Sequence, residues 1–236
     1  MKTRKPHFLW NLFFISSFCI GLAFLPKNSQ AADPPTIAVL DFENNSLFNR
    51  DEYQSLSKGL AEMMITGLNQ YGALRVVERQ KLRSIIEEIQ LSQTGMVSET
   101  SSLRAGKLLG AQNLVFGGFM VATGNKIRID VRIVEVETGL TVKANEVTGK
   151  TNDILSLIAK LNAKILRDLN VRISETGKKF EETKPVDVKA LMFFSQGVGF
   201  EDAGEGDQAA ACYQKALDIE PNFQQAKARL ERLRSE

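Results

Sequence analysis

Residues 112–147 read QNLVFGGFMVATGNKIRIDVRIVEVETGLTVKANEV, and this stretch decides the fold class. In residues 126–133, isoleucines and one valine alternate strictly with charged residues. Such a period of two is typical of a strand with one buried face and one solvated face. Gly124-Asn125 and Thr138-Gly139 are suited to tight hairpin turns. The stretch therefore predicts three antiparallel strands, over 112–122, 126–137 and 140–147.

The flanking sequence alternates short apolar runs with segments of helical periodicity. Two buried strands are predicted at 36–42 (TIAVLDF) and 74–77, and helices are predicted over 51–70, 78–90, 100–109 and 154–173. Asn49 is a candidate cap of the first helix, with Glu52 at the capping-box position. We therefore expect an α/β domain of the α+β type over residues 34–173, with a mixed sheet whose antiparallel hairpins are packed by helices.

The first 31 residues have the organisation of a secretory signal peptide. Three basic residues within the first five precede an apolar run from Phe8 to Leu25, and small residues at 29 and 31 favour cleavage after Ala31. An uncleaved anchor is the alternative, because the run approaches the ~20 apolar residues that span a bilayer. Polar residues within the run favour cleavage. Cys19 follows a bulky phenylalanine inside this run, so lipidation is not expected.

Removal of residues 1–31 changes the chemistry that the chain can offer. His7, Trp10 and Cys19 are lost, which leaves no histidine and one cysteine, Cys212. Lysine plus arginine falls by four from 30, to two fewer than the 28 acidic residues. A nucleic-acid partner is not indicated, because such partners usually require a basic excess. With one cysteine, no intramolecular disulfide can form.

The sequence of the mature chain lacks the familiar catalytic and cofactor-binding patterns. The absence of histidine excludes serine triads, histidine acid–base chemistry and the common zinc sites. Neither a phosphate-binding loop nor a dinucleotide fingerprint occurs. We interpret the carboxylates of Asp41 and Glu43, and of Glu87 and Glu88, as caps or solvated faces. Gly117-Gly118 indicates a bulge or a packing site within a strand, and Cys212 a small buried side chain. We expect no enzyme, no cofactor and no metal.

An ordered series of motifs carries a family resemblance. Residues 76–82 (VVERQKL), 85–88 (IIEE), 91–92 and 105–111 (AGKLLGA) resemble the signature of the CsgG-like family, the curli production assembly and transport components. The resemblance extends over about residues 36–173. The motif residues are Glu78, Arg79, Leu82, Gly106, Gly110 and Ala111, and we interpret them as structural. Glu78 can sit in the first turn of a helix and face its dipole, Gly110 can end the third helix, and Gly106 and Gly110 can let a helix approach the sheet closely.

The resemblance implies an exported, periplasmic protein that works at the outer membrane in the assembly or secretion of surface structures. The implied partners are envelope or secreted-fibre assembly proteins, with a ring-forming homo-oligomer as an alternative. The predicted hairpins lack long membrane-inserting extensions, and no aromatic residue follows Phe119 in them. A peripheral accessory is therefore favoured over a channel. A subunit of a secretion channel and a regulator of an envelope (cell-wall) enzyme are the alternatives left open.

The C-terminal part resembles a second family. Residues 174–186, rich in Glu, Lys and Thr, predict a linker. Residues 187–236 resemble a single tetratricopeptide (TPR) repeat, a small all-α helical hairpin, followed by a capping helix over 222–234. Its motif residues are Phe193, Gly197, Phe200, Ala209, Tyr213, Ala216 and Pro221. Because about three repeats are usually needed for stability, we expect this module to dock on the α/β domain, another subunit or a partner.

Overall fold

The computed structural model describes residues 34–91, 99–171 and 184–235. The predicted signal peptide and almost all of the predicted linker lie outside the described residues. Within the described part of the chain, none of the helices combines the length and the apolar character that crossing a membrane requires.

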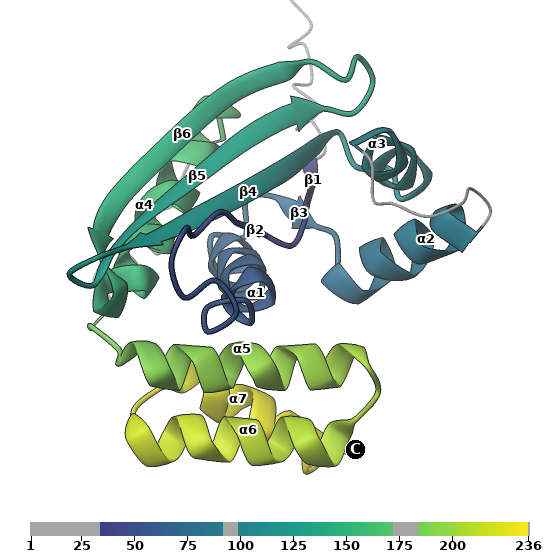
Figure 1. The fold of residues 1–236 in the computed structure, drawn as a ribbon. Coiled ribbons are helices and arrows are strands. Elements are labelled where there is room, and N and C mark those ends of the chain that lie inside the picture. Colours follow the sequence, from purple (N-terminus) through teal and green to yellow (C-terminus); the bar gives the residue numbers. More distant parts are fainter. Residues whose placement is uncertain (1–33, 92–98, 172–183, 236) are drawn as a thin grey trace, which may run out of the picture. The chain divides into compact units, whose positions relative to one another are not determined.

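A mixed β-sheet forms the centre of the structure (Figure 1), as predicted. Its strands are β1 (Thr36–Val39), β2 (Glu43–Asn44), β3 (Arg75–Val76), β4 (Asn113–Ala122), β5 (Lys126–Glu135) and β6 (Thr141–Lys150). The strand order is β3-β1-β4-β5-β6, and β2 pairs with β4. β1 runs parallel to β3 and β4, whereas β4, β5 and β6 are successive antiparallel neighbours. Gly124 and Asn125 both have positive φ, as a type I′ hairpin turn requires.

Helices cover both faces of this sheet. The helices of the α/β part are α1 (Leu56–Gln70), α2 (Arg79–Leu91), α3 (Glu99–Leu108) and α4 (Ile154–Asp168), the last preceded by a short 3-10 turn, Thr151–Asp153. The buried side chains Ile127, Ile129, Val131 and Ile133 of β5 pack with α1 and α4 in the main core. A smaller core joins α2 and α3 to the opposite face, at β1 and β4.

Three further helices continue the main core: α5 (Val188–Asp202), α6 (Gly206–Ile219) and α7 (Gln224–Leu233). Phe194 of α5 packs between Tyr213 of α6 and Phe223, with ring centroids 5.7 and 5.1 Å away. α5 also packs on α1, where Gly59 leaves the space that the side chain of Ser195 fills. We expected these helices to dock on the α/β domain, another subunit or a partner. The structure shows them docked on the α/β part.

Several predicted boundaries differ from the structure. The first strand ends at Val39 rather than residue 42, and the second is only two residues long. The first helix begins at Leu56, and Asn49 is not its cap, because Asn49 lies in a preceding turn with φ of 51°. Residue 55 occupies the cap position without a side-chain hydrogen bond. The capping-box prediction for Glu52 is therefore also wrong.

The C-terminal boundaries of the sheet and of α4 were also predicted inaccurately. β6 continues to Lys150, beyond the expected residue 147, and the connection over residues 136–140 is longer than a two-residue turn. α4 ends at Asp168 rather than residue 173, and the backbone N–H of its C-cap, Leu169, bonds to the carbonyl of Ile165. Local periodicity does not indicate where these elements end, because pairing with a neighbouring strand and packing on the sheet determine their ends.

We predict that the α1–α5 contact tolerates no side chain larger than hydrogen at Gly59. A Cβ there would overlap the side chain of Ser195, so Gly59→Ala should lower the free energy of unfolding by about 1–3 kcal/mol. Gly206→Ala is the matched control, because Gly206 is also helical and a Cβ there meets nothing within 4 Å. Urea denaturation of both variants checks the prediction. Equal stabilities would contradict a close helix contact at Gly59.

Candidate interaction site

The chain that follows β1 and runs through β2 forms a ridge that separates three hollows. We call residues Asp41–Asn45 the β1–β2 ridge. The hollows have volumes of about 570, 450 and 490 Å³, and Asp41 and Glu43 line all three. The first lies toward α1 and α5, the second over the outer face of β4 to β6, and the third toward α2 and α3.

A glycine in β4 determines where the ridge lies. Phe42 is buried, and its ring occupies the space that a side chain at Gly117 would fill. A Cβ at Gly118 would lie 2.9 Å from the side chain of Asn45. The glycine pair is therefore a packing site. The β4–β5 register runs unshifted through both glycines, which decides against the bulge alternative.

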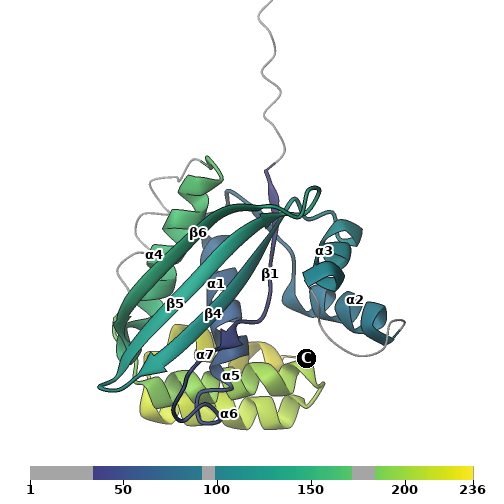
Figure 2. The same ribbon diagram turned by 45° about the horizontal axis from the view of Figure 1, so that its top comes forward.

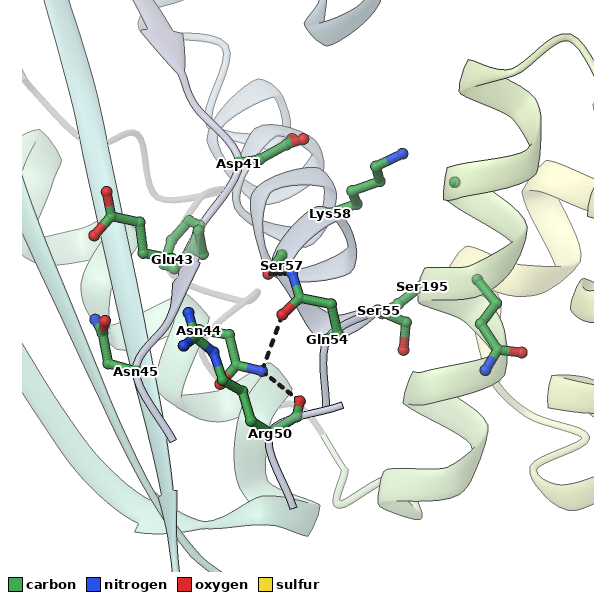
Figure 3. A pocket seen from close by; sticks show the side chains of 13 residues that line it. Asp41, Glu43, Asn44, Asn45, Arg50, Gln54, Ser55, Ser57, Lys58 and Ser195 are labelled. Atoms are coloured by element: carbon green, nitrogen blue, oxygen red, sulfur yellow. Dashed lines mark hydrogen bonds between the residues drawn. The ribbon is translucent and has the colours of Figure 1, made fainter. Parts of the chain in front are cut away.

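The first hollow has a rigid polar wall (Figure 3). The buried Asn44 donates from Nδ2 to the carbonyl of Arg50 at 2.8 Å and to Oε1 of Gln54 at 3.4 Å. Its Oδ1 accepts from the backbone N–H of Ser46, and the Ser46 hydroxyl accepts from the backbone N–H of Val121. These bonds fix the loop that leads into α1. The wall of the hollow is thus held by buried hydrogen bonds of Asn44 and Ser46.

Polar side chains of several kinds line this hollow. Its polar side chains are Asp41, Glu43, Asn44, Asn45, Arg50, Gln54, Ser55, Ser57, Lys58, Ser195 and Gln196. Both signs of charge are present, together with neutral donors and acceptors. Among residues 34–91, 99–171 and 184–235, no three His, Cys, Asp or Glu side chains are grouped so that they could hold a metal ion.

The third hollow has apolar side chains in its floor and a charged rim. Leu82 and Ile86 of α2 and Phe116 of β4 contribute to the floor. At the rim, Arg132 donates to both carboxylate oxygens of Glu99, at 2.8 and 3.2 Å, and lies 4.3 Å from the centroid of the Phe116 ring. The hydrogen bond from Arg132 lowers the pKa of Glu99, and the same bond raises the pKa of Arg132.

A network of ionised side chains joins the α/β part to α5–α7; we call it the junction network. Its members are Asp41, Lys58, Glu62, Arg79, Arg83, Glu201, Asp202, Arg229 and Arg232. Arg79, at the first residue of α2, is only 5% exposed. It donates to both carboxylate oxygens of Asp202 and, at 3.2 Å, to Asp41, while its Nε lies 3.5 Å from Glu62.

Glu62 connects this arginine to a second one. It lies in α1 among buried apolar residues and is only 7% exposed. Arg229 of α7 forms ion pairs with Glu62 and with Glu201 at the end of α5. Burial lowers the pKa of both arginines, but hydrogen bonds and charges from the surrounding carboxylates outweigh it and raise the pKa of Arg79 and Arg229. Both guanidinium groups therefore stay charged.

The predicted CsgG-like motif residues lie in different environments and do not form one site. Glu78 is exposed and lies just before α2 rather than in its first turn, and Leu82 is buried in the smaller core. A Cβ at Gly106 would lie 3.0 Å from Leu114, so α3 does approach the sheet there. Gly110 follows α3 with positive φ, and a Cβ there would meet nothing within 4 Å, so the close approach predicted for it is wrong. Ala111 is buried in the same core.

The predicted TPR motif residues lie mainly between α5 and α6. The Tyr213 ring occupies the space beside Gly197, and Ala209 and Ala216 are buried. Phe193 and Phe200 are half-buried against the core, and Lys215 lies 5.6 Å from the Phe193 ring centroid. Pro221 is exposed, just after the end of α6. Cys212 is buried, and burial raises the pKa of its thiol.

Sequence reasoning missed most of the junction network. It singled out Arg79 through the motif but not Glu62, Glu201, Asp202 or Arg229. A signal was present in α1, where Glu62 stands between apolar residues on the face that helical periodicity assigns to the core. A buried carboxylate requires a cationic partner, but the sequence does not show that this partner lies beyond residue 200.

Comparison with a family model confirms the first resemblance for part of the chain. Residues 23–122 match the family described as curli production assembly/transport component CsgG. In the described residues, the matched segment contains β1 to β4 and α1 to α3. It includes Arg79 but ends before α5–α7, for which the tetratricopeptide resemblance stays a prediction. No curated protein sequence matches the chain.

Solved structures show partial likenesses of fold. The C-terminal domain of LpoB from Escherichia coli is 17% identical, with a TM-score of 0.39, over 50% of this chain and 83% of its own. The PelC dodecamer from Paraburkholderia phytofirmans is 17% identical, with a TM-score of 0.33, over 58% and 88%. Lipoprotein GNA1162 from Neisseria meningitidis is 14% identical, with a TM-score of 0.38, over 58% and 97%. These likenesses concern the fold alone.

We predict that Arg79 is required for stability. Replacing it with Met leaves buried carboxylates without their main cation, so Arg79→Met should lower the free energy of unfolding by about 3–5 kcal/mol. Lys81→Met, two residues along, removes only an exposed ion pair with Glu78 and should cost less than about 1 kcal/mol. Chemical denaturation at neutral pH measures both. A similar small loss in the two variants would show that the network is not energetically coupled to folding.

We predict a pH-dependent contribution from the Arg132–Glu99 pair. Arg132→Gln should raise the pKa of Glu99 toward its ordinary value, as measured by carboxyl NMR titration. The folded-state pKa of Glu99 is lowered, so the stability contributed by the pair is present above the unfolded-state pKa and is lost as pH falls through the folded-state pKa. Wild type and variant should therefore converge in stability in acid. A stability difference that persists unchanged at low pH would contradict this prediction.

Proposed function

We propose that this chain is an exported, non-enzymatic component of an envelope assembly or secretion system, and that it acts by binding other proteins. The observation that carries the proposal is the match of residues 23–122 to the curli production assembly/transport family. The proposed location is the periplasm, with peripheral association at the outer membrane through partners. The surface structure served is curli or another secreted fibre.

The geometry around the β1–β2 ridge supports a binding role. Three hollows adjoin one short segment, and their linings combine carboxylates, guanidinium groups, amides and apolar side chains. Such mixed linings offer hydrogen bonds and charge complementarity, which give specificity between protein surfaces. Residues 32–236 contain no histidine, so they give no support to histidine-based acid–base catalysis.

We further propose that α5–α7 form a tetratricopeptide-type contact module. Its α5 side is occupied by α1, so the surface left for a partner is the outer side of α6. Ala211, Gln214, Lys215 and Asp218 are exposed on that helix. The partner would thus be recruited by a helix that the junction network and the main core hold in place, rather than by a freely moving arm.

Photo-crosslinking in the organism of origin tests the proposal. A photoreactive residue at Ala211, exposed on α6, should capture an envelope protein that the same residue at Lys81, exposed on α2, does not capture. The full chain should be recovered outside the cytoplasm, and removal of residues 2–31 should abolish both export and crosslinking. Cytoplasmic location of the full chain, or identical crosslinks from both positions, would overturn the proposal.

A further inference from the structure

The sheet ends in one long strand edge. β6 has ten residues and pairs only with β5 among the strands that the structure describes, so its other side borders no described strand (Figure 2). Its residues are exposed or half-buried throughout. The opposite edge, β3, has only two residues. An unpaired strand edge of this length is a template on which another strand can pair.

The register indicates which backbone groups of β6 face outward. The N–H of Thr151 donates to the carbonyl of Asn125, directly opposite it in the β5–β6 register. Backbone groups alternate along an antiparallel strand, so the odd-numbered residues 143–149 point toward β5. The N–H and C=O groups of Ala144, Glu146 and Thr148 therefore point to the free edge. Consistently, the Glu146 carbonyl accepts from Nζ of Lys164, which lies outside the sheet, at 2.9 Å.

Cations line this edge. Lys164 lies on α4, and Lys160 and Arg167 share its face of the helix, because residues three and four apart are neighbours. Lys160 and Arg167 are exposed. Lys143 and Lys150 of β6 are exposed as well. Asp168, next to this row, is already hydrogen-bonded to Asn145. The exposed carboxylate of Glu146 on β6 itself is ion-paired with Arg128. On the α4 side of the edge, an incoming strand would thus meet a row of positive charges.

We propose that the free edge of β6 binds an extended, acidic segment of a partner protein as an additional strand. The outward N–H and C=O groups of Ala144 and Thr148 and the outward N–H of Glu146 supply main-chain hydrogen bonds, and the row on α4 selects acidic side chains. A second copy of this chain fits less well, because antiparallel pairing of two β6 strands would bring two rows of lysine and arginine together. The inference rests on the proposed function in taking the partner to be a protein.

Peptide binding in solution tests this surface separately from cellular location. The probe is a capped, fluorescent peptide that alternates threonine and glutamate, and its counterpart alternates threonine and lysine. Only the glutamate peptide should bind, and the amide NMR signals of Ala144, Glu146 and Thr148 should shift most. Thr148→Pro removes an outward N–H and leaves the β5 ladder intact. This variant should weaken binding about tenfold or more, whereas Thr148→Ala should not.

Charge reversal gives a second arm that does not depend on proline being tolerated. Lys160→Glu combined with Arg167→Glu, both exposed, should invert the preference toward the lysine peptide. The proposal is overturned if neither peptide binds, if the shifted amides lie elsewhere, or if Thr148→Pro binds as wild type does. It is also overturned if light scattering finds a dimer that Thr148→Pro dissociates, which would assign the edge to a second copy. None of these results would change the predicted export or the predicted α6 crosslink. Failure of this inference is therefore distinguishable from failure of the proposed function.

Discussion

Helix α1 brings a carboxylate, Glu62, into the interior of the protein, and the arrangement of the other helices depends on how that charge is neutralised. An isolated ionised carboxylate is too costly to bury. Arg79 approaches it from the start of α2 and Arg229 from α7, and each arginine is held by further carboxylates, Asp202 and Glu201, at the end of α5. A helix terminus has unsatisfied carbonyls, so cations near the end of α5 are also favourable there.

This constraint makes α5–α7 part of the core rather than an appended arm. Close packing supports the same arrangement, because Gly59 admits Ser195 against α1, and Gly67 of the same helix admits Asn162 of α4. The Asn162 amide donates to the carbonyl of Met64 at 3.3 Å. With α1 enclosed in this way, surfaces for partners are left at the β1–β2 ridge, on the outer side of α6 and along β6. A protein built so presents several fixed surfaces for the protein contacts proposed above.

Much of the fold could be predicted because local patterns were strong. The alternation at residues 126–133 predicted β5 and its buried face, and the helical patterns predicted the four helices of the α/β part close to their observed positions. The predicted boundaries were less accurate. Asn49 and Glu52 fit a capping box in sequence, but the helix begins later, at Leu56. Hydrogen bonds of Asn44 and Ser46, one of them to Val121 of β4, hold the preceding chain in another conformation. Tertiary hydrogen bonds decided that outcome, and they have no local signature.

The candidate site was less predictable for the same reason. Arg79 was recognised within a motif, yet its role depends on Asp202, 123 residues away along the chain. Gly117 could be placed in a strand, but only the fold shows that it makes room for Phe42. The free edge of β6 followed neither from composition nor from periodicity, since strand order is a property of the whole sheet. The sequence thus predicts elements well and long-range pairs poorly.

If the junction network and the main core hold the helices together as described, α5–α7 and the α/β part unfold as one cooperative unit. Native-state hydrogen exchange at increasing denaturant measures this directly, because it resolves the opening free energy of each helix. The account predicts that core amides of α5, such as those of Leu191 and Val198, merge with those of Leu60 and Met64 in α1 at a single opening free energy. Exchange of the α5–α7 amides through a separate opening of lower free energy, with α1 still protected, would contradict it.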